Sequence, residues 1–325
     1  MKTDAIRISE YGAPEVLEVV SIELPEPAPG EVRIRHTAIG LNFIDTYHRT
    51  GLYPMPLPMT PGREAAGVVE AVGADVHDIK VGDRVAYAGG ALGAYAGHRN
   101  IDASVLVPLP ESVDDELAAA TFLKGLTAWY LLHHSYAVRP GDTVLLYAAA
   151  GGVGMLASQW ARKLGATVIG IVGSDEKATL ARDVGVVHTI LSDADDIPGI
   201  VRDLTDGEGV AAVYDSVGRD TFMTSLDCLR PHGVLVTFGN ASGAVEPFAP
   251  AELAKRGSLY VTRPILEHFV PTREQLLDAA NTLFAFLVDD QPTVRIGQRY
   301  ALQDVIQAHR DLEARQTTGS TLLIP

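Results

Sequence analysis

The chain has 325 residues, of which 47% are hydrophobic and 21% are charged, an ordinary balance for a globular protein of about two domains. Its formal net charge of −15 repels phosphate backbones and anionic lipid headgroups, so neither nucleic acid nor a membrane surface is expected as a partner. The single cysteine, Cys228, cannot form an internal disulfide or a multi-cysteine metal site, which favours a reducing, cytoplasmic setting. We find no signal-peptide pattern after Met1 and no apolar run long enough to span a bilayer.

Short strands separated by turns are predicted for the first third of the chain. Residues 32–35 alternate apolar and charged side chains after a turn at 29–31, and residues 84–87 follow a similar turn at 81–83. Residues 65–72 form another apolar segment of strand length. Together these patterns predict a barrel-like sheet.

Beyond residue 112 the pattern changes to strands that alternate with helices. Acids at 114–116 favour a helix start, because negative charge interacts well with the positive end of the helix dipole. Strands that alternate with helices form βαβ units, and therefore a parallel sheet with both faces covered, the Rossmann doubly wound α/β fold. The strands are predicted at 143–147, 167–172, 210–214 and 234–238, and the helices at 153–164 and 175–184, ended by Gly165 and Gly185.

The last part of the chain is expected to rejoin the first domain. A helical pattern begins at Thr272, and a short strand is predicted at 321–324. We therefore expect a discontinuous catalytic domain, residues 1–124 and 265–325, and a dinucleotide-binding domain, residues 125–264.

A glycine-rich segment follows the strand at 143–147. It matches the dinucleotide fingerprint G-x-G-x-x-G as Ala149-x-Gly151-x-x-Gly154, with Gly152 and Val153 inside it and alanine in place of the first glycine. Gly151 would let the backbone approach a pyrophosphate, Gly154 would let the helix pack on the strand, and the helix N-terminus offers N–H groups to the phosphates. A tight turn without a ligand is the alternative interpretation. The strand–turn–helix context favours phosphate binding.

The end of the next strand favours NADP over NAD. NAD enzymes usually carry an acid there that binds the ribose 2′-hydroxyl, but this strand ends in Gly173 and Ser174. Lys177 follows and could bind a 2′-phosphate, although it could equally be an ordinary surface lysine. The neighbouring acids, Asp175 and Glu176, suit the first turn of the following helix.

Four segments together carry a family signature: AIGLNFIDTY at 38–47, PGREAAG at 61–67, AAAGGVG at 148–154 and VYDSVGRD at 213–220. Further matches lie at 238–240, 260–264 and 319–325. With these segments, the chain resembles the medium-chain dehydrogenase/reductase superfamily from end to end, and within it the zinc-free bacterial quinone oxidoreductases related to zeta-crystallin. The resemblance implies a GroES-like β-barrel catalytic domain with the Rossmann domain, NADPH as the cofactor and a small-molecule quinone as the substrate.

The resemblance also bears on metal binding. The zinc alcohol dehydrogenases of this superfamily hold zinc at positions that resemble Asn42, Arg63 and Ala120, none of which can replace the thiolates and imidazole of a tetrahedral zinc site. The adjacent His133 and His134 point to different sides of a helix and cannot chelate together. We therefore expect no metal. An alcohol needs a Lewis acid before it can give up hydride, whereas a quinone is already a strong hydride acceptor, so loss of zinc favours quinones or other activated acceptors.

The resemblance further implies the residues of the site. The side chains around the nicotinamide and the acceptor would be Asn42, Tyr47, Tyr53 and Thr127. The cofactor would be held by Ala149, Gly151, Gly152, Val153, Gly154, Gly173, Ser174, Lys177, Ser192, Ser216, Phe238, Asn240, Arg263 and Arg315, with Lys177 and Arg315 at the 2′-phosphate and Ser192 where relatives carry a tyrosine.

Structural roles are the alternatives for some of these polar residues. Tyr47 and Tyr53 could be half-buried packing residues, and Asn42 could serve a turn. We expect Asp45 and Glu64 to be structural ion-pair partners rather than catalytic acids.

Two other functions stay open. The first is an NADPH-dependent reductase of activated carbon–carbon double bonds, such as those of enals and enones, which would use the same fold and cofactor. The second is a non-enzymatic role, as a crystallin-like structural protein or an RNA-binding protein, which the acidic charge and the phosphate cradle disfavour. A homodimer is expected in either enzymatic case, because the apolar strand at 257–262 would lie near a sheet edge, and open apolar edges tend to be paired.

Overall fold

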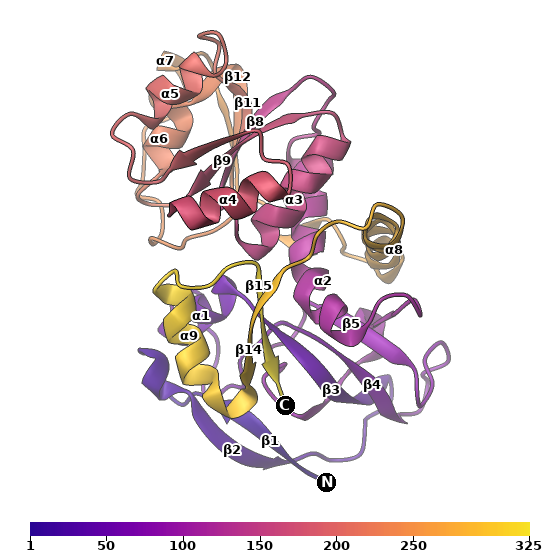
Figure 1. The fold of residues 1–325 in the computed structure, drawn as a ribbon. Helices are drawn as coiled ribbons and strands as arrows, with labels where there is room; N and C mark the ends of the chain where they lie inside the picture. The colour runs from indigo at the N-terminus through magenta and orange to yellow at the C-terminus, as the bar shows by residue number, and fades with distance from the viewer. The chain divides into compact units, whose positions relative to one another are not determined.

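The computed structural model describes residues 1–325 and divides them into two compact units (Figure 1). Unit 1 consists of Met1–Leu126 together with Val270–Pro325, and unit 2 consists of Thr127–Phe269. The expected domains had the same order and the same discontinuous first part, with their boundaries placed after residues 124 and 264.

Unit 1 is built on a seven-stranded sheet. Its strands lie in the order β14-β15-β3-β4-β5-β7, and β6 pairs with the first half of β3. A separate antiparallel pair is formed by β1 (Lys2–Arg7) and β2 (Glu18–Glu23). The strands of the large sheet are β3 (Glu31–Leu41), β4 (Glu64–Val72), β5 (Arg84–Ala88), β6 (His98–Asp102), β7 (Val107–Pro108), β14 (Ile296–Ala301) and β15 (Ser320–Ile324).

The strands predicted in the first third are confirmed, since they lie within β3, β4 and β5. The predicted helix starts near 114 and 272 are also confirmed. The last strand does return to the first domain, because β15 pairs antiparallel with β3, with Leu322 opposite Gly40. The helices of unit 1 are α1 (Phe43–Thr50), the first part of α2 (Asp115–Tyr130), α8 (Arg273–Asp289) and α9 (Val305–Glu313).

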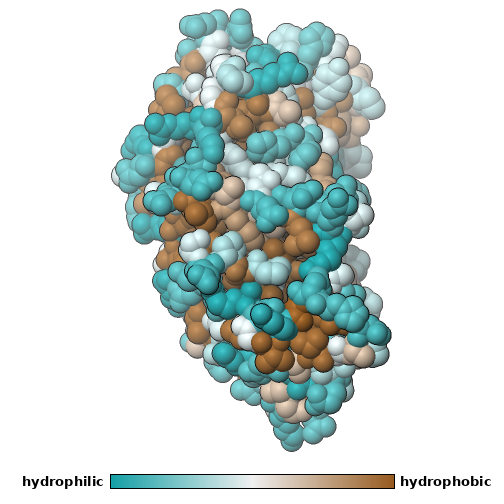
Figure 2. Space-filling view, turned by 90° about the vertical axis from the view of Figure 1, so that its right-hand side faces the viewer, coloured by the Kyte–Doolittle hydropathy of each residue, from teal (hydrophilic) through white to brown (hydrophobic).

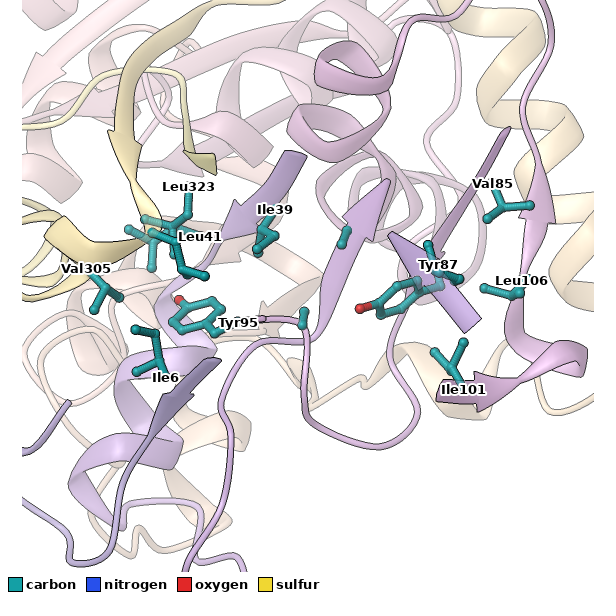
Figure 3. Packing of buried hydrophobic residues seen from close by; sticks show 14 of the residues in the cluster. Ile6, Ile39, Leu41, Val85, Tyr87, Tyr95, Ile101, Leu106, Val305 and Leu323 are labelled. Atoms are coloured by element: carbon teal, nitrogen blue, oxygen red, sulfur yellow. The ribbon is translucent and has the colours of Figure 1, made fainter. Parts of the chain in front are cut away.

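The core of unit 1 joins early and late parts of the chain. In Figure 3, the fully buried ring of Tyr95 lies among Leu41 of β3, Leu323 of β15 and Val305 of α9. Burying a side chain of this size contributes about 1.5–3 kcal/mol. The apolar core therefore holds the two separated segments of unit 1 together.

Unit 2 is built on a six-stranded sheet in which all neighbouring strands are parallel. The strand order is β10-β9-β8-β11-β12-β13, so the chain reverses its direction across the sheet between β8 and β11. Figure 1 shows α3 and α4 on one side of this sheet and α5 and α6 on the other. The strands are β8 (Thr143–Tyr147), β9 (Thr167–Val172), β10 (His188–Leu191), β11 (Val210–Asp215), β12 (Leu229–Thr237) and β13 (Tyr260–Thr262), and the helices are α3 (Gly152–Lys163), α4 (Asp175–Asp183), α5 (Ile197–Asp203), α6 (Phe222–Asp227) and α7 (Ala251–Lys255).

This arrangement is the predicted Rossmann fold. The strands predicted at 143–147 and 167–172 have the bounds of β8 and β9, and Gly165 and Gly185 follow α3 and α4 with φ angles of +88° and +93°. Glycine adopts such left-handed angles without steric cost, which is why it ends these helices. The short strand β10 was not predicted, and β12 begins earlier than the strand expected at 234–238.

One face of the surface, shown in Figure 2, is largely hydrophilic with separate hydrophobic areas. No helix combines the length and the hydropathy that crossing a bilayer requires.

Candidate active site

The parallel sheet of unit 2 brings the predicted cofactor residues of that unit to one side, the side at which the carboxyl ends of the strands lie. Because all six strands run in the same direction, their carboxyl ends meet at the same edge, which is where open α/β sheets bind ligands. Each strand is followed there by at least one of the predicted residues: Ala149 and Gly151–Gly154 after β8, Gly173, Ser174 and Lys177 after β9, Ser192 after β10, Ser216 after β11, Phe238 and Asn240 after β12, and Arg263 after β13.

The glycine-rich turn after β8 leaves the first N–H groups of α3 open. The Gly151 N–H donates to the Ala148 carbonyl oxygen at 2.9 Å, and the Met155 N–H donates to the Gly151 carbonyl oxygen at 2.9 Å. The three residues between them, 152–154, form the first turn of α3, and their N–H groups have no acceptor within the helix. A phosphate is the type of group that suits such a turn, because the helix dipole adds to the hydrogen bonds.

Gly154 is required by the close packing of α3 on the turn that follows β8. A Cβ atom at this position would lie 2.2 Å from the Ala148 carbonyl oxygen and 2.8 Å from the Ala149 Cα. With any other residue at this position, the first turn of α3 could not lie this close to the turn after β8. A close approach was predicted for the last glycine of the fingerprint, and the structure shows it against the turn after the strand rather than against the strand itself.

The alanine at the first fingerprint position is explained by a glycine on the next strand. Ala149 is fully buried, and its N–H donates to the Ile171 carbonyl oxygen of β9. A Cβ atom on Gly170 of β9 would lie 2.7 Å from the Ala149 Cβ. Only one of these two positions can carry a methyl group, and in this chain it is Ala149.

A small polar corner is formed where β9 and β10 end. The Ser174 hydroxyl caps α4 by accepting the Lys177 N–H at 3.3 Å. Ser192 lies next to it, since its N–H donates to the Val172 carbonyl oxygen at 2.8 Å. Gly173 is exposed, with no atom within 4 Å of a hypothetical Cβ. As predicted, no acid lies at the end of β9 itself.

The loops after β11 and β12 are held by a carboxylate that the sequence analysis did not single out. Asp215 is fully buried and accepts hydrogen bonds from the N–H groups of Val217 and Gly218 and from the hydroxyls of Thr221 and Ser225. These four donors fix the loop that contains Ser216. A lone acid at the end of an apolar strand is the signal that could have identified it.

The β12 and β13 ends are joined in the same region. The Phe238 N–H donates to the Asp215 carbonyl oxygen at 2.8 Å, and Arg263 Nη1 donates to the Thr237 carbonyl oxygen at 3.0 Å. Phe238 and Arg263 are thus positioned by neighbouring strands.

In unit 1, the predicted residues gather where β3 passes into α1. Asn42 is the N-cap residue of α1, and its Nδ2 donates to the Gly40 carbonyl oxygen at 3.3 Å. Tyr47 is 7% exposed, and its ring packs edge-on against Tyr53 with the centroids 5.2 Å apart. Tyr47 therefore does serve as a packing residue, as the alternative interpretation held. Its role at the acceptor stays a prediction.

Two other predicted residues belong to a different unit from the residues with which they were grouped: Thr127 was grouped with acceptor-side residues of unit 1, and Arg315 with cofactor residues of unit 2. Thr127 belongs to unit 2, where its side chain bonds with Tyr130, and Arg315 follows α9 in unit 1. The roles expected of Thr127 at the nicotinamide and of Arg315 at the 2′-phosphate stay predictions.

The positions of the zinc ligands are occupied by groups with other partners. Arg63 Nη2 donates to the Gly90 carbonyl oxygen at 3.5 Å, and the fully buried Ala120 accepts the Ser320 hydroxyl at 2.7 Å through its carbonyl. No cluster of three or more histidine, cysteine or acidic side chains could share a metal ion. His133 and His134 contact different rings, those of Trp160 and Trp129.

One expectation about the acids in unit 1 is wrong. Glu64 does form an ion pair, with the buried Lys124 at 3.0 Å, and it also accepts the Leu123 N–H. Asp45 forms none: its Oδ2 accepts the Asn42 N–H and the Tyr95 hydroxyl, each at 2.9 Å. Burial of this carboxyl raises its pKa to about 7, because the interior disfavours its charged form. The sequence could not show this, since Tyr95 lies far along the chain.

Comparison with known proteins gives the same assignment in both parts of the chain. The zinc-binding dehydrogenase family pattern matches residues 152–280, and that of the alcohol dehydrogenase GroES-like domain matches residues 28–111. A quinone oxidoreductase of Pseudomonas aeruginosa is 52% identical over 321 residues, which cover 98% of this chain and 99% of that protein. The chain belongs to the quinone oxidoreductases of the medium-chain dehydrogenase/reductase superfamily.

Two further members of this superfamily are informative. The crystal structure of Escherichia coli quinone oxidoreductase complexed with NADPH superposes with a TM-score of 0.97 at 48% identity, covering 99% of this chain and 100% of that one. A 2-haloacrylate reductase of a Burkholderia species is 44% identical over 326 residues, 98% of each chain. Members of this superfamily that resemble the present chain are therefore named for two different kinds of acceptor, a quinone and a 2-haloacrylate.

The packing of the glycine-rich turn gives a prediction about stability. We expect Gly154→Ala to lower the free energy of unfolding by about 1–3 kcal/mol, because the methyl group would overlap backbone atoms that cannot move independently. Gly173→Ala is the matched control at the same sheet edge. Its methyl group would meet no atom, so we expect a change below about 0.5 kcal/mol. Urea unfolding of both variants measures the difference, and equal midpoints would contradict the packing argument.

Proposed function

We propose that this chain is an NADPH-dependent quinone oxidoreductase that needs no metal ion. The observation that carries the proposal is its 52% identity to a quinone oxidoreductase over 98% of its length. The open turn after β8 and the polar corner after β9 support binding of a phosphorylated dinucleotide. Asparagine, arginine and alanine at the positions of zinc ligands support chemistry without a metal.

Residues of unit 2 would hold the cofactor. The N–H groups of Gly152 and Val153 suit the pyrophosphate, and the Lys177 ammonium and the Ser174 hydroxyl suit the 2′-phosphate. Close approach of a pyrophosphate also agrees with Gly151, where a Cβ atom would have only one neighbour, the Ala148 carbonyl oxygen at 3.2 Å. NADPH, when bound, would supply the hydride.

Residues of unit 1 would orient the acceptor. The Asn42 amide and the hydroxyls of Tyr47 and Tyr53 can donate hydrogen bonds to the carbonyl oxygens of a flat ring. None of them can ionise an alcohol, so the acceptor has to be electrophilic already. A quinone that gains a hydride becomes a hydroquinone anion, and one proton from water completes the hydroquinone, so no general acid of the protein is needed.

The second candidate is reduction of an activated carbon–carbon double bond. The observation that favours it is the 44% identity to a 2-haloacrylate reductase over 98% of the chain. This reaction differs at the proton, because protonation of carbon benefits from a positioned acid. Among the acceptor-side residues, Tyr47 and Tyr53 carry hydroxyls that could supply that proton.

Steady-state turnover with NADPH distinguishes these candidates. We expect reduction of small quinones that survives a metal chelator, little oxidation of simple alcohols, and no stoichiometric zinc by elemental analysis. Tyr47→Phe should reduce quinone turnover only slightly, because the hydroxyl assists orientation. Efficient enal reduction with inert quinones would favour the double-bond reductase instead, as would a loss of several hundredfold in turnover with Tyr47→Phe, about 3.5 kcal/mol, which would show that Tyr47 delivers a proton.

Cofactor preference tests the polar corner after β9. We expect Lys177→Ala to raise the Michaelis constant for NADPH about tenfold or more and to leave that for NADH unchanged, since a charge-assisted contact to phosphate contributes roughly 1.5–3 kcal/mol. Lys255→Ala is the control, because Lys255 ends α7, ahead of the amino end of β13, and pairs with Glu252. An equal loss with both cofactors would show that Lys177 does not bind the 2′-phosphate.

The edge strand β13 supports a homodimer. It is the last strand of the unit 2 sheet, and Tyr260 on it is 62% exposed. An open apolar edge of this kind tends to pair with another strand. We expect the dimer mass in light scattering at micromolar concentration and a shift toward monomer with Tyr260→Glu. Val81→Glu, at an equally exposed position in unit 1, should leave the dimer intact, and a monomeric wild-type protein would refute the prediction.

A further inference from the structure

A chain of buried hydrogen bonds in unit 1 ends at the backbone of Asn42. Arg49 Nη1 lies 3.1 Å from Nδ1 of His309, and Nε2 of His309 lies 3.2 Å from the Tyr95 hydroxyl. That hydroxyl donates to Oδ2 of Asp45 at 2.9 Å, and the same oxygen accepts the Asn42 N–H at 2.9 Å. The chain joins α9, the segment before β6, and α1, elements that are far apart in the sequence.

The direction of every hydrogen bond in this chain is determined. Arginine has only donors, so Nδ1 of His309 must accept and its proton must be on Nε2. The Nε2–H then donates to the Tyr95 oxygen, which leaves the Tyr95 proton for Asp45. Burial, with the nearby Arg49 charge, lowers the His309 pKa to about 3 and keeps the ring neutral in this tautomer. All donors therefore point toward Asp45.

Both ends of α1 are tied by these contacts. Asp45 lies in the first turn and holds the Asn42 N–H, while Arg49 lies in the last turn and makes a bidentate ion pair with Glu313 of α9, at 2.6 and 2.9 Å. Arg49 Nε also donates to the Gly12 carbonyl oxygen. Tyr47 lies between the two anchored residues, so the place of its ring depends on both.

Stability alone does not account for this arrangement. Asp45, Tyr95 and His309 are fully buried and Arg49 is 1% exposed. In protein cores, apolar residues of similar volume often stabilise as well as or better than a buried polar network, because they avoid the desolvation of charged and polar groups. What the polar chain adds over an apolar core is a single permitted geometry for the start of α1.

We propose that His309 and Tyr95 are positioning residues for the reduction: through Asp45 they set the place of Asn42 and Tyr47, and so the orientation of the acceptor. This role rests on the proposed function, in which Asn42 and Tyr47 contact the acceptor. The chain of buried hydrogen bonds takes no part in the chemical step, because neither His309 nor Tyr95 exchanges a proton during turnover.

The test compares two fully buried tyrosines of the same core. Tyr95→Phe removes the donor to Asp45, whereas Tyr87→Phe removes a hydroxyl that bonds with His36 and Arg99 and does not contact α1. We expect kcat/KM for the quinone to fall about tenfold or more with Tyr95→Phe and to stay within about twofold with Tyr87→Phe. The dissociation constant for NADPH, measured by tryptophan fluorescence, should be unchanged in both.

The pH profile adds a readout that a purely structural role would not change. Ionised Asp45 accepts hydrogen bonds more strongly than the protonated acid, so quinone kcat/KM should rise with pH near 7. The charged groups that face Asp45 are Glu64 of β4 and Lys124 of α2, both unaltered in these variants. The Tyr95 hydrogen bond lowers the Asp45 pKa, so Tyr95→Phe should move the inflection upward by about half a unit or more.

A pair of variants at His309 gives an independent comparison if Tyr95→Phe does not fold. His309→Gln can still accept from Arg49 and donate to Tyr95, whereas His309→Leu can do neither. We expect the glutamine variant to keep most of the quinone activity and the leucine variant to lose it. Equal activities of the two would overturn the proposal.

Hydrogen exchange separates this inference from the proposed function. Mass spectrometry of the peptide that covers residues 38–50 should show faster exchange in Tyr95→Phe than in Tyr87→Phe, whatever the substrate is. A wild-type protein that reduces no quinone would refute the proposed function alone. An active wild-type protein with unchanged exchange, kcat/KM and pH profile in Tyr95→Phe would overturn the positioning role alone.

Discussion

Each strand of the unit 2 sheet runs in the same direction as its neighbours, so all of its carboxyl-end loops leave the sheet at one edge. Residues separated by more than a hundred positions, such as Gly151 and Arg263, are thereby brought to the same edge without any contact that is specific to the pair. The sharp turn after β8 then depends on a few small residues, Gly154 and Gly170 above all, which permit the close packing of helix, turn and strand. Backbone direction and small side chains therefore shape the turn after β8.

In unit 1, the predicted acceptor-side residues lie on or beside one short helix: Asn42 precedes α1, Tyr47 lies within it and Tyr53 follows it. Helix α1 has 8 residues, too few to be stable on its own in water. Its position is set by contacts at both ends, with Asp45 at one and Arg49 at the other, against a core of tyrosine and aliphatic side chains. The apolar core supplies the stability of this unit, and the buried polar contacts supply the orientation of the helix.

The sequence allowed prediction wherever the signal was local. The strand at Thr143–Tyr147 is a continuous apolar run, and Gly165 marks the end of a helix by its freedom to adopt a positive φ. Strand β10 escaped prediction because it is short and only partly buried. The partners of Asp45 could not be predicted either, since Tyr95 lies 50 positions away and no periodic pattern connects the two. Cofactor residues were recognisable by motif, whereas the buried contacts that place α1 required the fold.

The insertion of unit 2 into unit 1 has a consequence for the order of folding during synthesis. Unit 2 is continuous in the chain, so every strand of its sheet has been made before α8 is translated. The sheet of unit 1 is completed later, because β15, which pairs with both β14 and β3, follows the whole of unit 2 in the chain. Until then, the β3 edge near Leu41 has no partner on that side. A nascent chain that already includes all of unit 2 but lacks β15 therefore presents an unpaired β3 edge, the kind of feature through which incomplete chains aggregate.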